Sequence, residues 1–171
     1  MSSAERIRLR QIQTEAEGYL ELGMPQHALD VLDRLGDTTY YTSRAFYLQG
    51  EAFKQLGRFR QALDPLRKAA EIAPSKVHVW LALGWCYKRL GLLTEAVAAM
   101  EEAVIVEPND AITHYNLACY LSLAGEKNRA LVHLAESLLI DPDYRDLIDE
   151  EPDFDPIRSD AEFRAITSII V

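Results

Sequence analysis

Glycine, proline and alanine recur in this sequence at a common interval of 34 residues, and this repeat restricts the fold more than any other feature. The glycines are Gly23, Gly57, Gly91 and Gly125. The prolines are Pro74, Pro108 and Pro142, and the alanines, each five residues after a glycine, are Ala28, Ala62, Ala96 and Ala130. A unit of this length is one supersecondary element, which buries its apolar face only by stacking on its neighbours. The sequence therefore predicts an array of similar units.

Each unit is expected to be a pair of antiparallel helices. In residues 77–110, one helical face is indicated by the i, i+3, i+4, i+7 spacing of Trp80, Leu83, Gly84 and Tyr87. Gly91 then ends this helix, because glycine adopts the left-handed conformation without a steric penalty. A second apolar stripe follows, and Pro108 closes the unit because proline cannot continue a helix. The predicted fold class is all-α.

The pattern resembles the tetratricopeptide repeat, in which a large aromatic residue, Leu-Gly, Tyr, Ala, Phe or Leu, Ala and Pro stand at fixed offsets. Residues 77–110 match every offset, with Met100 at the Phe or Leu position. The resemblance predicts an array over residues 1–142, with repeats at 43–76, 77–110 and 111–142 and a divergent repeat at about 9–42, where Tyr40 replaces the proline. It implies a right-handed α-solenoid whose first helices line a concave groove for a peptide or partner protein.

Two details of the helical hairpins follow from their residues. Small residues recur where the paired helices approach most closely, at Gly50, Gly84 and Ala118, and a larger side chain there is expected to force the helices apart. Pro65 lies inside the second helix of its repeat. Because that helix is predicted to begin near Phe59, Pro65 falls in its second turn, and we expect a local kink there rather than a break.

The periodicity stops after Pro142, and residues 143–171 hold nine acidic and three basic residues, a local charge of 3 − 9 = −6. Their apolar residues are spaced as on helical faces: Tyr144, Leu147 and Ile148, then Phe163, Ile166 and Ile169 or Ile170. Helix starts are predicted at Asp155–Pro156 and at Asp160. A stack of hairpins leaves its last apolar face bare, so this segment is predicted to be an acidic helical cap. Its aspartates lack the glycine and terminal glutamate of a calcium loop.

The groove residues follow from the repeat frame. Offsets two, five, nine, twelve and thirteen of each first helix point away from the packed stripe. The partner-binding residues predicted on this basis are Arg44, Tyr47, Glu51, Lys54, His78, Leu81, Trp85, Lys88, Arg89, Tyr115 and Cys119. Large apolar side chains clustered on a face that the fold need not bury mark a contact site, and Trp, Tyr and Arg often dominate binding energy. The alternative is that the C-terminal segment or a second copy of the chain covers them.

Net charge and residue spacing disfavour several classes of function, catalysis among them. With 18 Lys and Arg against 27 Asp and Glu, the net charge is −9, which disfavours binding to nucleic acid or to anionic membranes. The histidines follow no metal-ligand spacing, and no glycine-rich loop follows a strand pattern, so we expect no catalytic residue, cofactor or metal.

Cys86 and Cys119 lie in apolar surroundings, which indicates reduced thiols and a cytoplasmic location. No apolar run has membrane length.

The predicted function is therefore an adaptor that binds a peptide or protein segment in the groove. Two alternatives use the same face: a secretion-type or assembly chaperone that holds a client segment, and a structural homodimer that buries the face against itself. A clamp for a chaperone's C-terminal carboxylates is disfavoured. In the repeat proteins that bind such carboxylates, Lys and Asn stand at offsets five and nine of one repeat. Here one repeat has Leu81 and Trp85 at these offsets, and Glu51 of another would repel a carboxylate.

Overall fold

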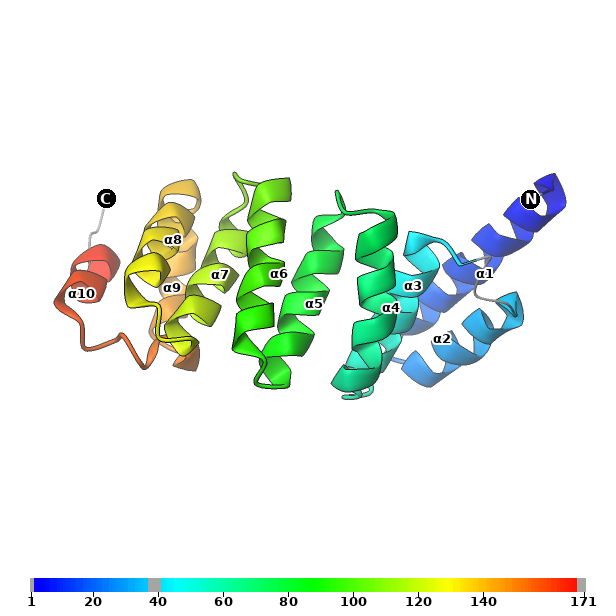
Figure 1. Ribbon diagram of the computed structural model, residues 1–171, viewed down its shortest axis with the longest axis horizontal. Helices are drawn as coiled ribbons and strands as arrows, with labels where there is room; N and C mark the ends of the chain where they lie inside the picture. Colours follow the sequence, from blue (N-terminus) through cyan, green and yellow to red (C-terminus); the bar gives the residue numbers. More distant parts are fainter. Residues whose placement is uncertain (1, 37–40, 169–171) are drawn as a thin grey trace. The chain divides into compact units, whose positions relative to one another are not determined.

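The computed structural model describes residues 2–36 and 41–168, which form α-helices and short 3₁₀ helices and contain no strand (Figure 1). This confirms the predicted all-α class. Tyr40, Ile169 and Ile170, for which there were also sequence-based expectations, lie outside the described residues. The helices divide between two compact units, Met1–Leu90 and Gly91–Val171, each of which has its own packing.

The first unit contains two helical hairpins and one further helix. Its elements are α1 (Ser3–Glu21), α2 (Pro25–Leu32), the 3₁₀ helix η1 (Asp33–Leu35), α3 (Ser43–Gln55), α4 (Phe59–Ile72) and α5 (Val77–Arg89). Within it, α1 pairs with α2 and α3 with α4, and α5 packs against both α3 and α4. The first helices of successive repeats, α3 and α5, therefore lie next to each other.

The second unit contains one helix, one hairpin and an irregular C-terminal segment. Its elements are α6 (Leu93–Val106), α7 (Ala111–Leu123), α8 (Lys127–Ile140), η3 (Pro142–Tyr144), α9 (Arg145–Ile148), η4 (Pro152–Phe154) and α10 (Ala161–Ser168). Helix α7 packs between α6 and α8, η4 lies against α7, and α10 packs on α8.

Local sequence signals account for where these helices begin and end. The Thr42 hydroxyl accepts a hydrogen bond from the Ala45 N–H at 3.2 Å, and the Asp110 carboxylate accepts one from the Thr113 N–H at 3.2 Å. Both are N-cap bonds that satisfy free donors of the first turn. The repeat glycines that follow the first helices, Gly23, Gly57, Gly91 and Gly125, have φ of +68°, +71°, +73° and +79°. This confirms the prediction that the left-handed conformation of glycine ends these helices.

The close approach of α3 and α4 depends on a missing side chain. A Cβ atom added to Gly50 would lie 2.5 Å from Cγ of Leu66, which is fully buried. Ala62 is also fully buried in α4, and a hydrogen bond of 2.9 Å from the Ser43 hydroxyl to the Ala69 carbonyl ties the two helices together. Helix α4 continues through Pro65, which confirms that the proline does not break the helix.

The C-terminal segment differs from the helical cap that was predicted. Helix α10 begins after Asp160 as expected, and the Asp160 carboxylate accepts the Glu162 N–H at 2.9 Å. The helix start predicted at Asp155–Pro156 is wrong, because the chain turns there instead. The turn is held by Arg158, whose guanidinium donates to the carbonyls of Ile148 at 3.1 Å and Glu151 at 2.7 Å.

Candidate functional site

The predicted groove residues of the first unit lie on α3 and α5, and Trp85 is at the centre of their aromatic part. The Trp85 side chain remains 37% exposed, and its ring packs edge-on against Phe59 of α4 at 5.1 Å. Two cations flank it: Lys54 Nζ and the Arg89 guanidinium each lie 5.5 Å from the centre of the Trp85 ring. Arg89 also lies 5.2 Å from the Phe59 ring. Cation–π contacts hold the long basic side chains beside the indole while it faces solvent.

The remainder of this face combines aromatic rings with paired charges. The Tyr47 and His78 rings meet edge-on at 4.5 Å across α3 and α5. Lys54 Nζ lies 2.7 Å from a carboxylate oxygen of Glu51, and Arg44 pairs with Glu17 of α1. Leu81 and Lys88, both on α5, are half-buried. We define the α3–α5 face by its predicted residues in this unit: Arg44, Tyr47, Glu51, Lys54, His78, Leu81, Trp85, Lys88 and Arg89.

Burial suppresses acid–base chemistry on and beneath the α3–α5 face. Desolvation, and after it the negative charges of Glu51 and Glu17, raises the pKa of the Tyr47 phenol. The Cys86 thiol points into the core, and its burial raises its pKa to about 11, although the charge of Lys54 opposes the change. Both groups therefore stay protonated at neutral pH, and a protonated thiol is a poor nucleophile.

In the second unit the chain itself covers the equivalent positions, Tyr115 and Cys119 of α7. The Tyr115 ring packs against Phe154 of η4 at 5.5 Å and against Tyr144 of η3 at 5.2 Å. Phe154 is fully buried and also contacts Phe163 of α10, with 5.7 Å between ring centres.

This arrangement corrects the expectation that Tyr115 and Cys119 lie on an uncovered face. They retain only 5% and 2% of their exposure. The physical reason is that three aromatic or apolar residues of the C-terminal segment, Phe154, Ile157 and Phe163, become buried in the same unit. Covering by the C-terminal segment was the alternative noted from the sequence, and it applies to these two residues.

A histidine pair that the sequence spacing did not reveal lies between α7 and α8. The Nδ1 atoms of His114 and His133 are 3.0 Å apart, and Nε2 of His114 is 2.9 Å from the Pro108 carbonyl oxygen. Since a carbonyl only accepts, neutral His114 donates from Nε2 and accepts at Nδ1, so His133 donates from Nδ1. The buried, hydrogen-bonded His114 ring is the structural role expected for this position.

The His133 ring predicts a dependence of stability on pH. Burial, followed by the nearby His114 and Arg129, lowers the pKa of His133 below its ordinary value of 6.5. The unfolded chain therefore binds this proton more tightly than the folded protein does. The stabilising effect of neutral His133 is complete above pH 6.5 and is lost as the pH falls from there through the lower pKa of the folded state.

We accordingly expect the free energy of unfolding to decrease as the pH is lowered below 6.5, and His133→Gln to flatten that dependence. Urea unfolding followed by circular dichroism at a series of pH values measures it. His27→Gln removes an exposed histidine of α2 and is the matched control. Equal slopes for the wild type and His133→Gln would contradict the assignment.

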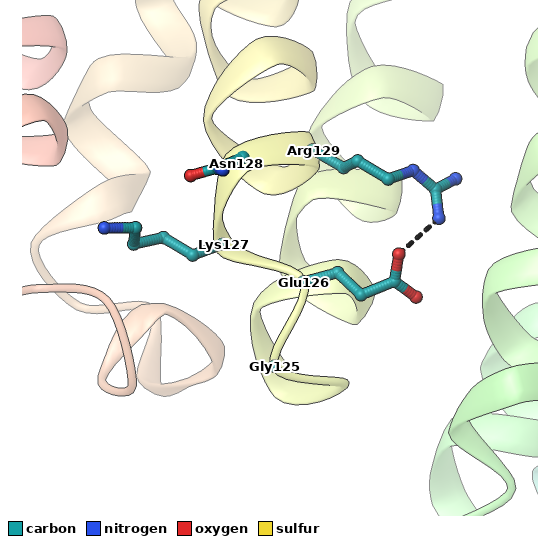
Figure 2. A pocket seen from close by; sticks show the side chains of 5 residues that line it. All are labelled: Gly125, Glu126, Lys127, Asn128 and Arg129. Carbon is teal, nitrogen blue, oxygen red and sulfur yellow. Dashed lines mark hydrogen bonds and ion pairs between the residues drawn. The ribbon is translucent and has the colours of Figure 1, made fainter.

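The described surface also has open hollows, and these lack the convergent groups of an active site. One, of about 360 Å³, lies at the loop between α7 and α8 and is lined by Gly125, Glu126, Lys127, Asn128 and Arg129 (Figure 2). Figure 2 shows the Lys127 and Arg129 side chains pointing in opposite directions. Lys127 pairs with Asp160 at 2.7 Å and Arg129 with Glu126 at 2.5 Å. These are structural ion pairs between surface side chains.

Among the helices of residues 2–36 and 41–168, none has the length and apolar character needed to span a membrane.

Comparisons with known proteins agree with the fold of repeated helices. Residues 54–118 match the family model described as "Tetratricopeptide repeat". No curated protein matches the sequence.

Solved structures of similar fold share few residues with this chain. A fragment of MamA from Desulfovibrio magneticus RS-1 is 17% identical with a TM-score of 0.72, covering 97% of this chain and 94% of that one. YrrB, described as "a TPR protein with an unusual peptide-binding site", is 22% identical with a TM-score of 0.70, covering 79% and 70%. TTC0263, a protein of Thermus thermophilus, is 22% identical with a TM-score of 0.64, covering 85% and 80%. Residues 54–118 are therefore similar to the tetratricopeptide repeat, and the chain has the helical fold of these solved structures.

Proposed function

We propose that this protein is a non-enzymatic adaptor whose α3–α5 face binds an extended segment of a partner protein. The observation that carries the proposal is the exposed Trp85 ring, which lies between Lys54 and Arg89 on a face that the first unit does not itself bury. An indole with neighbouring cations is a typical centre of binding energy, because it offers a large apolar surface together with charge.

The charges of the surrounding repeat indicate the chemistry of the partner. Residues 41–76 carry seven basic and three acidic residues, a local charge of 7 − 3 = +4. An apolar or aromatic residue next to acidic residues fits this surface, since the ring would pack on Trp85 and the acids would face Arg89 and Lys54. The second unit supports this chemistry, because its own first-helix face already holds Phe154 between Asp153 and Asp155.

The likeness to YrrB supports a peptide ligand only by analogy of fold, since the two chains share 22% of their residues. The specific groups that favour peptide binding in this chain are those of the α3–α5 face.

Replacement of Trp85 tests the proposal. We expect Trp85→Ala to weaken partner capture at least about 30-fold, because truncation of a central hot-spot residue costs roughly 2 kcal/mol or more. The measurement is affinity purification from the native source, followed by a titration of the captured partner against both proteins.

The matched control is Ile72→Ala, which removes an apolar side chain that is 55% exposed on α4 of the same unit. Both variants should keep the wild-type helical circular dichroism. Equal partner affinity for Trp85→Ala and the wild type would contradict the assignment of this face.

A further inference from the structure

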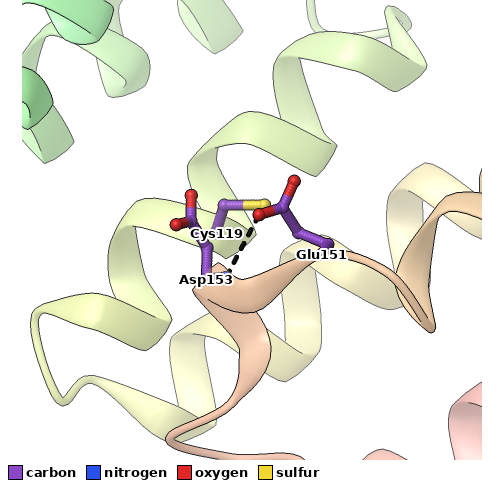
Figure 3. Close-up of side chains that lie close together, drawn as sticks. All are labelled: Cys119, Glu151 and Asp153. Atoms are coloured by element: carbon purple, nitrogen blue, oxygen red, sulfur yellow. Dashed lines mark hydrogen bonds between the residues drawn. The ribbon is translucent and has the colours of Figure 1, made fainter.

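Three side chains with metal-ligand atoms converge where the C-terminal segment crosses α7. The Cys119 Sγ atom and one carboxylate oxygen each of Glu151 and Asp153 all lie within 4.8 Å of one another (Figure 3). Cys119 and Asp153 are buried, and Glu151 is partly exposed. Because Cys119 and Glu151 are 151 − 119 = 32 residues apart, no short sequence motif reveals this cluster.

The donor set and its spacing suit zinc. Zinc binds cysteine sulfur at about 2.3 Å and carboxylate oxygen at about 2.0–2.2 Å in a tetrahedron, so its ligand atoms lie about 3.4–3.6 Å apart. The three donor atoms, all within 4.8 Å of one another, would have to approach to that distance on binding an ion. Sulfur favours zinc over calcium or magnesium, which take oxygen ligands. Three protein ligands leave the fourth position of the ion for water.

The Tyr115 hydroxyl provides an independent sign that this position holds a ligand. Tyr115 lies one turn before Cys119 on α7 and is 5% exposed, and its hydroxyl has no hydrogen-bond partner among residues 2–36 and 41–168. The Tyr115 ring packs against Phe154, the residue that follows Asp153, with 5.5 Å between ring centres, so Tyr115 lies beside the segment that carries the two carboxylates. A buried hydroxyl without a partner is unfavourable, because it has lost its hydrogen bonds to water. A water on a bound ion would supply that partner.

The charges of the cluster also favour a cation. A thiolate and two carboxylates would bring three negative charges together, and the two carboxylates belong to a segment of nine acidic and three basic residues. Arg158 is one of the three basic residues of this segment. Its guanidinium donates to the carbonyls of Ile148 and Glu151 and to the Asp155 carboxylate. A divalent ion would offset the repulsion directly.

We propose that Cys119, Glu151 and Asp153 bind one zinc ion, which fastens the C-terminal segment to α7. Binding replaces the thiol proton of Cys119, which passes to solvent, and forms one bond from sulfur and one from each carboxylate to the metal. The ion adds a cross-link between α7 and η4 to the aromatic packing of Phe154 on Tyr115.

Cobalt is the spectroscopic probe for this site. Titration of the full chain with Co²⁺ should produce a sulfur-to-cobalt charge-transfer band in the near ultraviolet that saturates at one equivalent, and competition with Zn²⁺ should remove it. Cys119→Ser should abolish the band. Cys86→Ser is the matched control, because Cys86 is the other cysteine of the chain and lies in the core of the first unit. It should leave the band unchanged.

Glu151→Gln keeps the proposal testable if Cys119→Ser does not fold, since Glu151 is only partly buried. Loss of this ligand should weaken zinc binding by at least the roughly 10- to 100-fold that loss of an outer-shell partner costs. Helical circular dichroism verifies folding of each variant. The proposal is overturned if no charge-transfer band forms, or if zinc binds Glu151→Gln and the wild type equally, as it would on an ordinary acidic surface.

Discussion

Phe154→Ala should destabilise the second unit by about 3–5 kcal/mol, the cost of removing a buried aromatic side chain from a packed core. Phe154 is fully buried and packs against both Tyr115 and Phe163, so the cavity would form between α7 and the C-terminal segment. We expect the urea unfolding transition of this unit to shift to lower concentration. Amide hydrogens of α7 should also exchange faster, because the segment that covers them would detach more often.

Leu147→Ala is the control for Phe154→Ala. Leu147 belongs to the same C-terminal segment, but its side chain is 53% exposed. Substitutions at such surface positions usually change stability by no more than about 0.5 kcal/mol. If both variants unfold at the same urea concentration, Phe154 does not anchor the segment to α7.

Leu66→Ala should destabilise the first unit by about 2–5 kcal/mol, since Leu66 is fully buried at the crossing of α3 and α4. Gly50→Ala should also destabilise, by about 1–3 kcal/mol, because its new Cβ would meet Leu66. The contact distance of 2.5 Å is too short for two carbon atoms, and the atom concerned is Cγ, which cannot move without the whole Leu66 side chain. Urea unfolding followed by circular dichroism measures both effects.

The double variant Gly50→Ala/Leu66→Ala distinguishes this crossing from a general loss of stability. Removal of the Leu66 side chain relieves the contact with the new Cβ, so the double variant should be destabilised by less than the sum of the single variants. Gly18→Ala is the control for helix propensity, because nothing lies within 4 Å of a Cβ at that helical position. It should be neutral or slightly stabilising. Strict additivity at residues 50 and 66 would contradict the predicted clash.

The parts of the fold that the sequence predicts are those determined by short-range chemistry. Helices α3, α5 and α7 begin at Ser43, Val77 and Ala111, the positions given by the 34-residue interval. The glycine that follows each of them has a positive φ. Each 34-residue repeat contains the residues that form its own turns and its contact with the next helix. The periodicity is therefore sufficient to predict where these helices begin and end. The close approach of the two helices at Gly50 was predictable because small residues recur at this position of the repeat.

The C-terminal segment was harder to predict because it has no repeat. Its acidic residues and helical spacing predicted a helical cap with helix starts at Asp155–Pro156 and at Asp160. Only the second start is found, because at the first Arg158 holds a turn by donating to the carbonyls of Ile148 and Glu151. These bonds run from a side chain to backbone carbonyls seven and ten residues earlier, and no periodic pattern in the sequence marks them. The covering of Tyr115 and Cys119 depends on where Phe154 packs, which spacing along the chain does not determine.

In the candidate site too, features within one helix were predictable from the sequence, and contacts between different elements were not. Offsets within a helix predicted that Trp85 faces away from the core, where it is 37% exposed, and the structure adds the ring and cation beside it, Phe59 and Lys54. The contact between His114 and His133 and the cluster around Cys119 join different elements, so neither has a local sequence signal.

Site-specific photo-cross-linking tests the central claim, that the α3–α5 face binds the partner. A photoreactive amino acid at position 81, next to Trp85 on α5, should form a discrete cross-linked species with the partner that excess unlabelled wild-type protein suppresses. The same group at position 72, exposed on α4, should form none. Cross-linking from position 72 and not from position 81 would contradict the account.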